Sequence, residues 1–347
     1  MHLGHLLLRM IDLRSDTITK PTPEMLDAMM SAQVGDDVFG DDPTVNALQE
    51  KLASMFGMED GIYCPSGTMT NQIGIRLNTV PQDEVICHEH SHVYLYEGGG
   101  MMYNSMVSPK LLQGDRGRIT AQQVQEHINP DDIHFPRTKL VVLENTMNKG
   151  GGSCYDFEKI EDIAKVCQDH QLRLHLDGAR LFNAIVKTGD DPKNYGKAFD
   201  TISICFSKGL GAPVGSVLLG SKEAIKEAKR IRKVFGGGMR QAGYIAAACI
   251  YALEHHVERL AEDHQRAQKL GGILHKLPFV EEVMPVDTNI VIAKLEGSQS
   301  ESVFLEKLKK QGILAVAFGK NLVRFVTHLN FTDDDLNSFE NAIRRIS

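Results

Sequence analysis

Apolar residues recur at every third or fourth position in several stretches of the chain, which predicts amphipathic helices. The clearest stretch is 43–56, where Asp42 stands at the position of an N-cap. Residues 156–170 and 221–235 show the same helical period. Residues 241–275 continue it over a longer stretch without a proline, so we expect one long helix there.

Short apolar runs between these helices predict buried strands. The runs are EVICHE (84–89), KLVVLEN (139–145), LRLHLDG (172–178), TISICFS (201–207) and GSVLLGS (215–221). Buried strands that alternate with helices are typical of an α/β fold, with a mostly parallel open sheet covered by helices on both faces. In such a sheet the functional loops follow the C-terminal ends of the strands.

The pattern changes after Pro278. The segments NIVIAKL, GILAVAF and LVRFVTH predict strands and 301–311 predicts a helix, which together indicate a smaller α+β domain. We therefore divide the chain into three parts. These are an N-terminal extension (1–9) expected to be disordered or non-native, a large domain (10–250) and a small C-terminal domain (251–347).

The composition favours a protein that acts on a small molecule. The 347 residues are 42% hydrophobic and 24% charged with a net charge of −7, and the basic residues form no block that would suit a nucleic acid. The absence of tryptophan also argues against a surface for stacking bases. Six scattered cysteines without a Cys-x-x-Cys pair, and no apolar run that would span a membrane, predict a cytoplasmic protein.

Three histidines at alternate positions raise the question of a metal site. His88, His90 and His92 follow Cys87 closely, and on a strand that continued to residue 92 the three imidazoles would share one face. Such a set could converge on a zinc ion. The residues alone leave this alternative open.

A lysine and an aspartate at the ends of two predicted strands indicate different chemistry. Lys208 directly follows a buried strand, in a glycine-rich bend, where it either extends into solvent or forms a Schiff base with a carbonyl compound. Asp177 ends the preceding strand and Arg180 lies three residues on. Asp177 could be a helix N-cap, but an Asp and a Lys at adjacent strand ends are also what pyridoxal phosphate needs.

An anion site for the cofactor phosphate is available earlier in the chain. Ser66, Gly67 and Thr68 combine a glycine turn, hydroxyl groups and the N-terminus of a predicted helix, whose free N–H groups favour an anion. Alone, this tripeptide is equally consistent with a simple turn. Its value comes from its combination with Asp177 and Lys208.

The whole chain from Met10 onward resembles the low-specificity L-threonine aldolases. The segments that carry the resemblance are MIDLRSDTITKPT, VGDDVFGDDPTVNALQ, PSGTMTNQ, LHLDGARLFNA, SKGLGAPVGSVLLG, GGGMRQAG and VRFVTH. That family consists of pyridoxal-phosphate (PLP) enzymes of the aspartate aminotransferase type, fold type I. The resemblance implies this fold, PLP as cofactor, and cleavage of L-threonine or L-allo-threonine to glycine and acetaldehyde.

The resemblance also implies roles for individual residues. Lys208 would bind the cofactor covalently, Asp177 its pyridine nitrogen, and Gly67 and Thr68 its phosphate. The substrate carboxylate would be bound by Ser15, Arg180 and Arg324, with Arg180 also near the phenolic oxygen. From a neighbouring subunit, Arg240 and Lys233 would reach the cofactor phosphate. The family's active sites are shared in this way within homotetramers built as dimers of dimers.

The resemblance bears on the histidines too. It implies that His92 stacks on the cofactor ring and that His134 lies near the side-chain oxygen of the substrate. His88 and His90 then have no assigned role. The resemblance therefore predicts that these histidines do not bind a metal. The general base would be His92, His134 or a bound water, and His134 or water is favoured because a stacked ring is poorly oriented for in-plane proton transfer. Met147 stands where the family has a histidine, which puts substrate preference or rate in doubt.

Two other classes of enzyme are alternatives. Another enzyme of fold type I, such as an aminotransferase, a β-eliminating lyase or a hydroxymethyltransferase, would share most of these residues. An NAD-dependent oxidoreductase is disfavoured because the glycine runs at 98–100, 150–152 and 236–238 do not form a strand–GxGxxG–helix arrangement.

Overall fold

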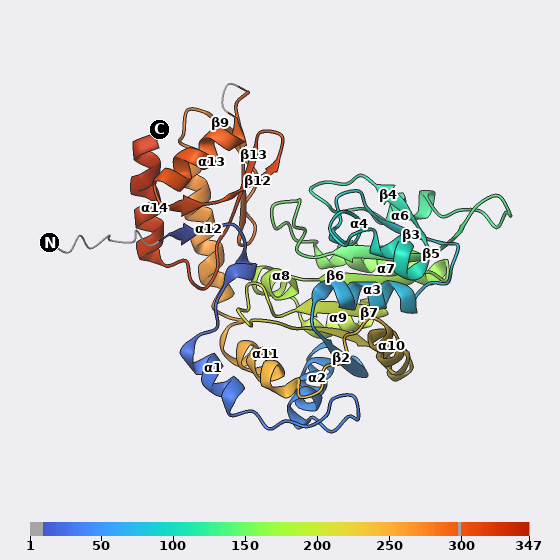
Figure 1. Ribbon diagram of the computed structural model, residues 1–347. Helices are drawn as coiled ribbons and strands as arrows, with labels where there is room; N and C mark the ends of the chain where they lie inside the picture. The colour runs from blue at the N-terminus through green and yellow to red at the C-terminus, as the bar shows by residue number, and fades with distance from the viewer. Residues whose placement is uncertain (1–9, 298–299, 347) are drawn as a thin grey trace.

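Two sheets organise the protein in the computed structural model, which describes residues 10–297 and 300–346 (Figure 1). The larger sheet has seven strands in the order β2-β8-β7-β6-β5-β3-β4. Only β8 runs antiparallel to its neighbours, which confirms the predicted mostly parallel sheet. The strands are β2 (Asp60–Cys64), β3 (Asp83–His88), β4 (Ser108–Leu112), β5 (Arg137–Glu144), β6 (Arg173–Gly178), β7 (Thr201–Cys205) and β8 (Ser216–Gly220).

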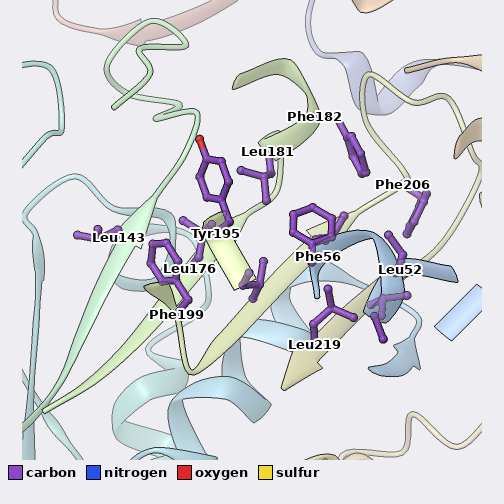
Figure 2. Packing of buried hydrophobic residues seen from close by; sticks show 14 of the residues in the cluster. Leu52, Phe56, Leu143, Leu176, Leu181, Phe182, Tyr195, Phe199, Phe206 and Leu219 are labelled. Atoms are coloured by element: carbon purple, nitrogen blue, oxygen red, sulfur yellow. The ribbon is translucent and has the colours of Figure 1, made fainter. Parts of the chain in front are cut away.

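Helices cover this sheet on both faces because alternate residues of each strand point to opposite sides. On β8, Val217 and Leu219 join the main hydrophobic cluster with Phe56, whereas Leu218 packs against the opposite cluster. Figure 2 shows the main cluster, in which aromatic rings such as Phe56 and Phe182 fill the space between sheet and helices. The covering helices are α2 (Pro43–Phe56), α3 (Gly67–Leu77), α7 (Phe157–Asp169), α8 (Leu181–Thr188), α9 (Pro192–Ala198) and α10 (Lys222–Val234).

Local sequence explains where these helices begin. Asp42 caps α2 by accepting hydrogen bonds from two backbone N–H groups, as expected from its position, and Gly57 ends the helix in the left-handed conformation. Ser66 caps α3 through its hydroxyl oxygen. The other short helices that precede β5 in the chain are α1 (Pro23–Met30), α4 (His92–Leu95), α5 (Gly100–Ser105), α6 (Ala121–Glu126) and a 3-10 turn at Asp16–Ile18.

A smaller antiparallel sheet of four strands forms the C-terminal part of the fold, in the order β12-β13-β10-β9. Its core combines Phe304, Phe325 and Phe339 with Leu13, which follows the short strand β1 near the N-terminus. That strand pairs with β11 in parallel, so the N-terminal segment of the described chain packs with the C-terminal elements (Figure 1). The elements are β1 (Ile11–Asp12), β9 (Val280–Val283), β10 (Ile290–Leu295), β11 (Ile313–Leu314), β12 (Val316–Gly319), β13 (Leu322–Val326), α13 (Glu301–Lys310) and α14 (Asp333–Ile346).

The single long helix expected over 241–275 is wrong. The structure has two helices, α11 (Gly243–His255) and α12 (Leu260–Leu274), separated by a turn in which His256 Nδ1 lies 2.7 Å from the carbonyl oxygen of Leu210. The physical reason is that α11 packs into the core of the large sheet, whereas the apolar face of α12 packs into the core of the small one. The domain boundary at residue 250 stays a prediction.

Two other expectations concern the ends of the chain and membranes. The proposed extension, residues 1–9, lies outside the described residues. Within the described part of the chain, no helix combines the length and apolar character needed to cross a bilayer.

Candidate active site

The predicted lysine and aspartate lie at the ends of neighbouring strands. Asp177 is on β6 and pairs in register with Ser203 of β7, and Lys208 follows the end of β7. On the other side, Asp177 pairs in register with Glu144 at the end of β5. Three strands of the sheet therefore deliver an amine and two carboxylates to the same edge.

A cleft of about 520 Å³ opens above this edge and is closed on its far side by the small sheet. Its lining comes from the N-terminal segment, the large sheet with its loops, and the small sheet. The residues are Ser15, Thr17, His92, Tyr96, Asn148, Lys149, Arg180, Lys208, Val316, Ala317, Phe318, Gly319 and Arg324. A larger hollow, of about 920 Å³, lies beside α7 and α9 at the opposite edge of the sheet and contains none of the predicted site residues.

Asp177 is almost completely buried and held by two donors. Its Oδ2 accepts a hydrogen bond from Asn71 Nδ2 at 2.9 Å, and its Oδ1 accepts one from the backbone N–H of Ala179 at 3.1 Å. Burial and the neighbouring charge of Asp177 raise the pKa of Glu144 to about 7. The two carboxylates therefore lie close enough for the charge of one to oppose ionisation of the other.

The N-terminus of α3 supplies the anion cradle. Ser66 Oγ accepts a hydrogen bond from the N–H of Met69, and Gly67 and Thr68 form the first turn of the helix. A Cβ atom at residue 67 would lie 2.4 Å from Cys205 Sγ, so only glycine allows α3 to approach the end of β7 this closely. The first turn of a helix this close to Lys208 suits a phosphate.

Lys208 has no ion-pair partner within residues 10–297 and 300–346. Its Nζ atom lies 3.9 Å from Cys205 Sγ, which is a weak contact. An amine without a counterion, a buried carboxyl group on the next strand and an anion cradle are the three groups that PLP requires. These residues therefore fit the cofactor.

The two arginines of the cleft differ in their partners. Arg180 donates two hydrogen bonds of 2.7 Å to the buried carboxylate of Asp16, which also accepts one from Asn289. Burial alone would raise the pKa of Asp16, but the charge of Arg180 lowers it below its ordinary value. Arg324, in contrast, binds only neutral oxygen atoms, on Asn148 and Arg14.

Arg324 consequently has capacity for an anion. Its Nε atom is buried and has no hydrogen-bond partner. Burial, followed by repulsion from Arg180, lowers the pKa of Arg324 to about 10. Ser15 lines the same cleft, where its Oγ atom accepts hydrogen bonds from the N–H and the hydroxyl of Thr17. A substrate carboxylate would complete this set.

Three of the predicted residues, His134, Lys233 and Arg240, lie away from the cleft and from the strand ends beneath it. His134 is highly exposed, pairs with Asp132 at 2.7 Å and precedes β5. The strand's length separates it from the site by about 26 Å, at roughly 3.3 Å per residue. Lys233 and Arg240 are also exposed, and Arg240 forms an ion pair with Asp36 at 2.9 Å. A role in a neighbouring subunit stays a prediction for Lys233 and Arg240, and a place near the side-chain oxygen of the substrate stays a prediction for His134.

His88, His90 and His92 do not share one face of a strand. Strand β3 ends at His88, His90 lies in the following turn, and His92 starts α4. The backbone N–H of His90 donates a hydrogen bond to His88 Nδ1, so these two rings stay together outside the cleft. Of the three, only His92 lines the cleft, where its Nδ1 atom lies 2.9 Å from the buried carboxylate of Glu97.

Met147 does not reach the cleft either. Its side chain is fully buried and packs against Gly117, where a Cβ atom would lie 2.1 Å from Met147 Cγ. The departure from the family's histidine therefore affects packing behind the site rather than its lining.

Comparisons with known proteins agree with this geometry. The family model described as beta-eliminating lyase matches residues 12–298. A low specificity L-threonine aldolase from Escherichia coli (strain K12) is 43% identical over 328 residues, which cover 94% of this chain and 96% of that protein. The chain belongs to the low-specificity L-threonine aldolase family.

Plant and protozoan members extend this similarity. A low-specificity L-threonine aldolase from Arabidopsis thaliana is 38% identical and covers 96% of this chain and 95% of its own length. The solved structure of a threonine aldolase from Leishmania major has a TM-score of 0.83 over 97% of this chain and 99% of that one. At 20% identity that structure supports the fold, and the predicted fold type I is confirmed.

Proposed function

We infer that the protein is a PLP-dependent lyase that cleaves L-threonine and L-allo-threonine to glycine and acetaldehyde. One observation carries this inference: the unpaired amine of Lys208 and the buried Asp177 end adjacent strands beneath a cleft that also holds Arg324. The names of the relatives favour aldol cleavage over the other reactions of fold type I. The description of the family model keeps β-elimination as the alternative to be tested.

The cofactor, when bound, supplies the electron sink that allows the Cα–Cβ bond to break. The protein holds the groups around it. Asp177 would keep a proton on the pyridine nitrogen, the first turn of α3 would hold the phosphate, and Lys208 would attach to the aldehyde carbon. Arg324 and Ser15 would bind the carboxylate of the amino acid, and Arg180, which is paired with Asp16, would serve the phenolic oxygen.

The β-hydroxyl of the substrate must lose a proton, and His92 is the candidate general base in this cleft. Burial lowers the pKa of His92, but its hydrogen bond with Glu97 and the charges of Asp177, Glu97 and Glu144 outweigh burial and raise the pKa above its ordinary value. His134 would take this role only from another subunit, or a bound water would take it.

We propose further that active sites are shared within a homotetramer, with Arg240 and Lys233 reaching the cofactor phosphate of a neighbour. Phe39 and Val234 support this proposal, because both are about three-quarters exposed beside those two basic residues. We also propose a cytoplasmic location, which is supported by six free cysteines.

Product analysis tests the proposed reaction. The purified protein, loaded with PLP, is given L-threonine without added keto acid or folate, and acetaldehyde, glycine, ammonia and 2-oxobutyrate are measured. Equal amounts of acetaldehyde and glycine are expected. Ammonia with 2-oxobutyrate would instead identify a β-eliminating enzyme, and a requirement for a keto acid would identify an aminotransferase.

A further inference from the structure

The imidazole of His92 is held by a carboxylate with no basic partner among the described Lys and Arg residues. The Glu97 side chain is completely buried. Its Oε1 atom lies 2.9 Å from His92 Nδ1 and 2.8 Å from Asn71 Nδ2, and its Oε2 atom accepts from Gln72 Nε2 at 2.6 Å. A buried carboxylate that only amides and an imidazole satisfy is costly to maintain, so its location calls for an explanation.

Asn71 connects this carboxylate to Asp177. Its amide nitrogen donates to Glu97 and, at 2.9 Å, to Asp177 Oδ2, so both amide hydrogens are used by carboxylates. The amide oxygen of Asn71 must therefore accept, and it lies 3.2 Å from His175 Nε2. One amide group thus fixes the positions of the acid behind the cofactor ring and the acid behind His92.

The remaining partners confirm this orientation of the amide. Burial lowers the pKa of His175 to about 4, so its ring is neutral and carries one hydrogen. With that hydrogen on Nε2, Nδ1 must accept from the hydroxyl of Thr201, at 2.8 Å. The Thr201 oxygen in turn accepts from Asn78 Nδ2 at 3.0 Å. Each donor in this network therefore faces an acceptor.

The same reasoning fixes the hydrogen of His92. Both oxygens of Glu97 already accept hydrogen bonds from amide groups, as a carboxylate does, so the hydrogen between Glu97 and His92 belongs to His92 Nδ1. The other ring nitrogen, Nε2, makes no hydrogen bond to the described part of the chain, and the ring lines the cleft. When His92 is neutral, Nε2 is consequently the nitrogen with a free lone pair.

We propose that Glu97 and Asn71 are positioning residues of the aldol cleavage, which hold His92 with its hydrogen on Nδ1 and present an unprotonated Nε2 to the substrate. This proposal rests on the proposed function. In the cleavage, Nε2 takes the proton of the β-hydroxyl, directly or through a water, as the C=O bond of the aldehyde forms. One proton leaves oxygen and one is gained at Cα of glycine, so the reaction needs no further reactant.

Charged groups around His92 determine how the proposal appears in a pH profile. Glu97 and Glu144 contact it, and Asp177 lies beyond Asn71. Four cations line the same cleft: Lys149, Arg180, Lys208 and Arg324. The three acids favour the protonated imidazole, whereas the four cations oppose it. Removal of the Glu97 charge should therefore lower the pKa of His92 and move the acidic limb of kcat/KM to lower pH.

The decisive variant is Glu97→Gln, with Glu84→Gln as its matched control. Glu84 is also a buried, amide-bonded glutamate, but it lies at the start of β3, away from the cleft. Glu97→Gln should lower kcat by about 10- to 100-fold with little change in KM, as expected when the partner of a functional histidine is lost. Glu84→Gln should leave kcat and the pH profile unchanged.

A second background separates positioning from simple structural support. In His92→Asn protein, Glu97→Gln should cause no further loss of kcat, because Glu97 acts through the imidazole. Two results would overturn the proposal: an unchanged acidic limb in Glu97→Gln, or an equal loss of kcat in both backgrounds.

A measurement on the apoprotein keeps the test independent of activity. The rate at which diethyl pyrocarbonate modifies His92 is followed against pH by peptide mass spectrometry. In the wild-type chain its midpoint should lie above that of N-acetylhistidine, and Glu97→Gln should lower it. A wild-type midpoint at or below that of N-acetylhistidine refutes the proposal even if Glu97→Gln does not fold. Failure of the aldolase assay with a raised midpoint would refute only the proposed function.

Discussion

The two walls of the cleft are built on different principles. On the large-sheet wall, Asp177, Glu97 and Glu144 are buried and joined to one another through amides and backbone groups. On the small-sheet wall, Arg324 is a half-buried cation whose Nε atom is unpaired, and no acidic side chain of residues 10–297 or 300–346 pairs with it. The first wall is complete before any ligand arrives, whereas the second lacks an anion that the substrate would bring.

This difference suggests which residues serve the cofactor and which serve the substrate. Polar groups whose hydrogen bonds are already made within the protein can hold a resident cofactor in a fixed position without reorganisation. An unsatisfied guanidinium gains most from an incoming carboxylate, because the cost of its burial is then offset. Variants on the two walls should therefore have different kinetic signatures.

Lys208→Ala should have the largest effect. Loss of the amine removes covalent attachment of the cofactor, so we expect activity to fall by at least about 10³-fold, the scale seen when a nucleophile is deleted. The visible absorption band of the protein should disappear as well. The measurement is an absorption spectrum together with acetaldehyde release. An unchanged band in this variant would contradict the assignment of Lys208.

Asp177→Ala should have the second largest effect. We expect kcat to fall by about 10²- to 10³-fold, which is comparable to the removal of one strong electrostatic contact. Cofactor affinity should also fall, because Asp177 and Asn71 form part of the same wall. Titration of the apoprotein with PLP, followed by turnover at saturating PLP, separates the two effects. Near-normal turnover at saturation would show that this carboxylate is not needed to maintain the electron sink.

Arg324→Lys should act on the substrate side alone. A lysine keeps the charge but not the planar fork, so KM for threonine should rise by about 10- to 100-fold, equivalent to roughly 1.4–2.8 kcal/mol. The absorption band and the PLP affinity should not change. Arg118→Lys, which alters an arginine on the loop at Asp115, is the control. A matching loss of PLP affinity in Arg324→Lys would remove the distinction between the walls.

Met147→Leu should have the smallest effect. The thioether is buried against Gly117 and lines neither wall, and a swap of similar volume in a core costs less than about 1.5 kcal/mol. KM for threonine and allo-threonine should stay within about twofold of the wild-type values, which is near the limit of resolution for an uninvolved residue. A large change in the ratio of the two KM values would show that residue 147 influences the substrate pocket.

The sequence was most informative where a short motif has a local structural consequence. The strands that end at Asp177 and before Lys208, the cap at Ser66 and the cap at Asp42 all follow from nearby residues. The break at 256–259 was missed because it has no local cause. No proline or glycine marks it, and it arises because α11 and α12 pack into different cores.

The acids behind the site were missed for a similar reason. Glu97 bonds Asn71 and Gln72, and Asp16 bonds Arg180, across long separations in the chain. Periodicity does not reveal such pairs. One signal was available: Asn71 and Gln72 are polar residues next to the apolar positions of an amphipathic helix, and both proved to be buried. Polar residues on the inner face of a predicted helix are therefore worth examining as parts of a hidden network.

The pairing of β1 with β11 has a consequence for the order of events during synthesis. Ser15 and Asp16 leave the ribosome long before Ile313 and Leu314, yet the strand just before them pairs with those two residues. The large sheet can therefore be synthesised in full while the opposite wall of the cleft is still missing. The cleft is completed only after β11, β12 and β13 have been translated.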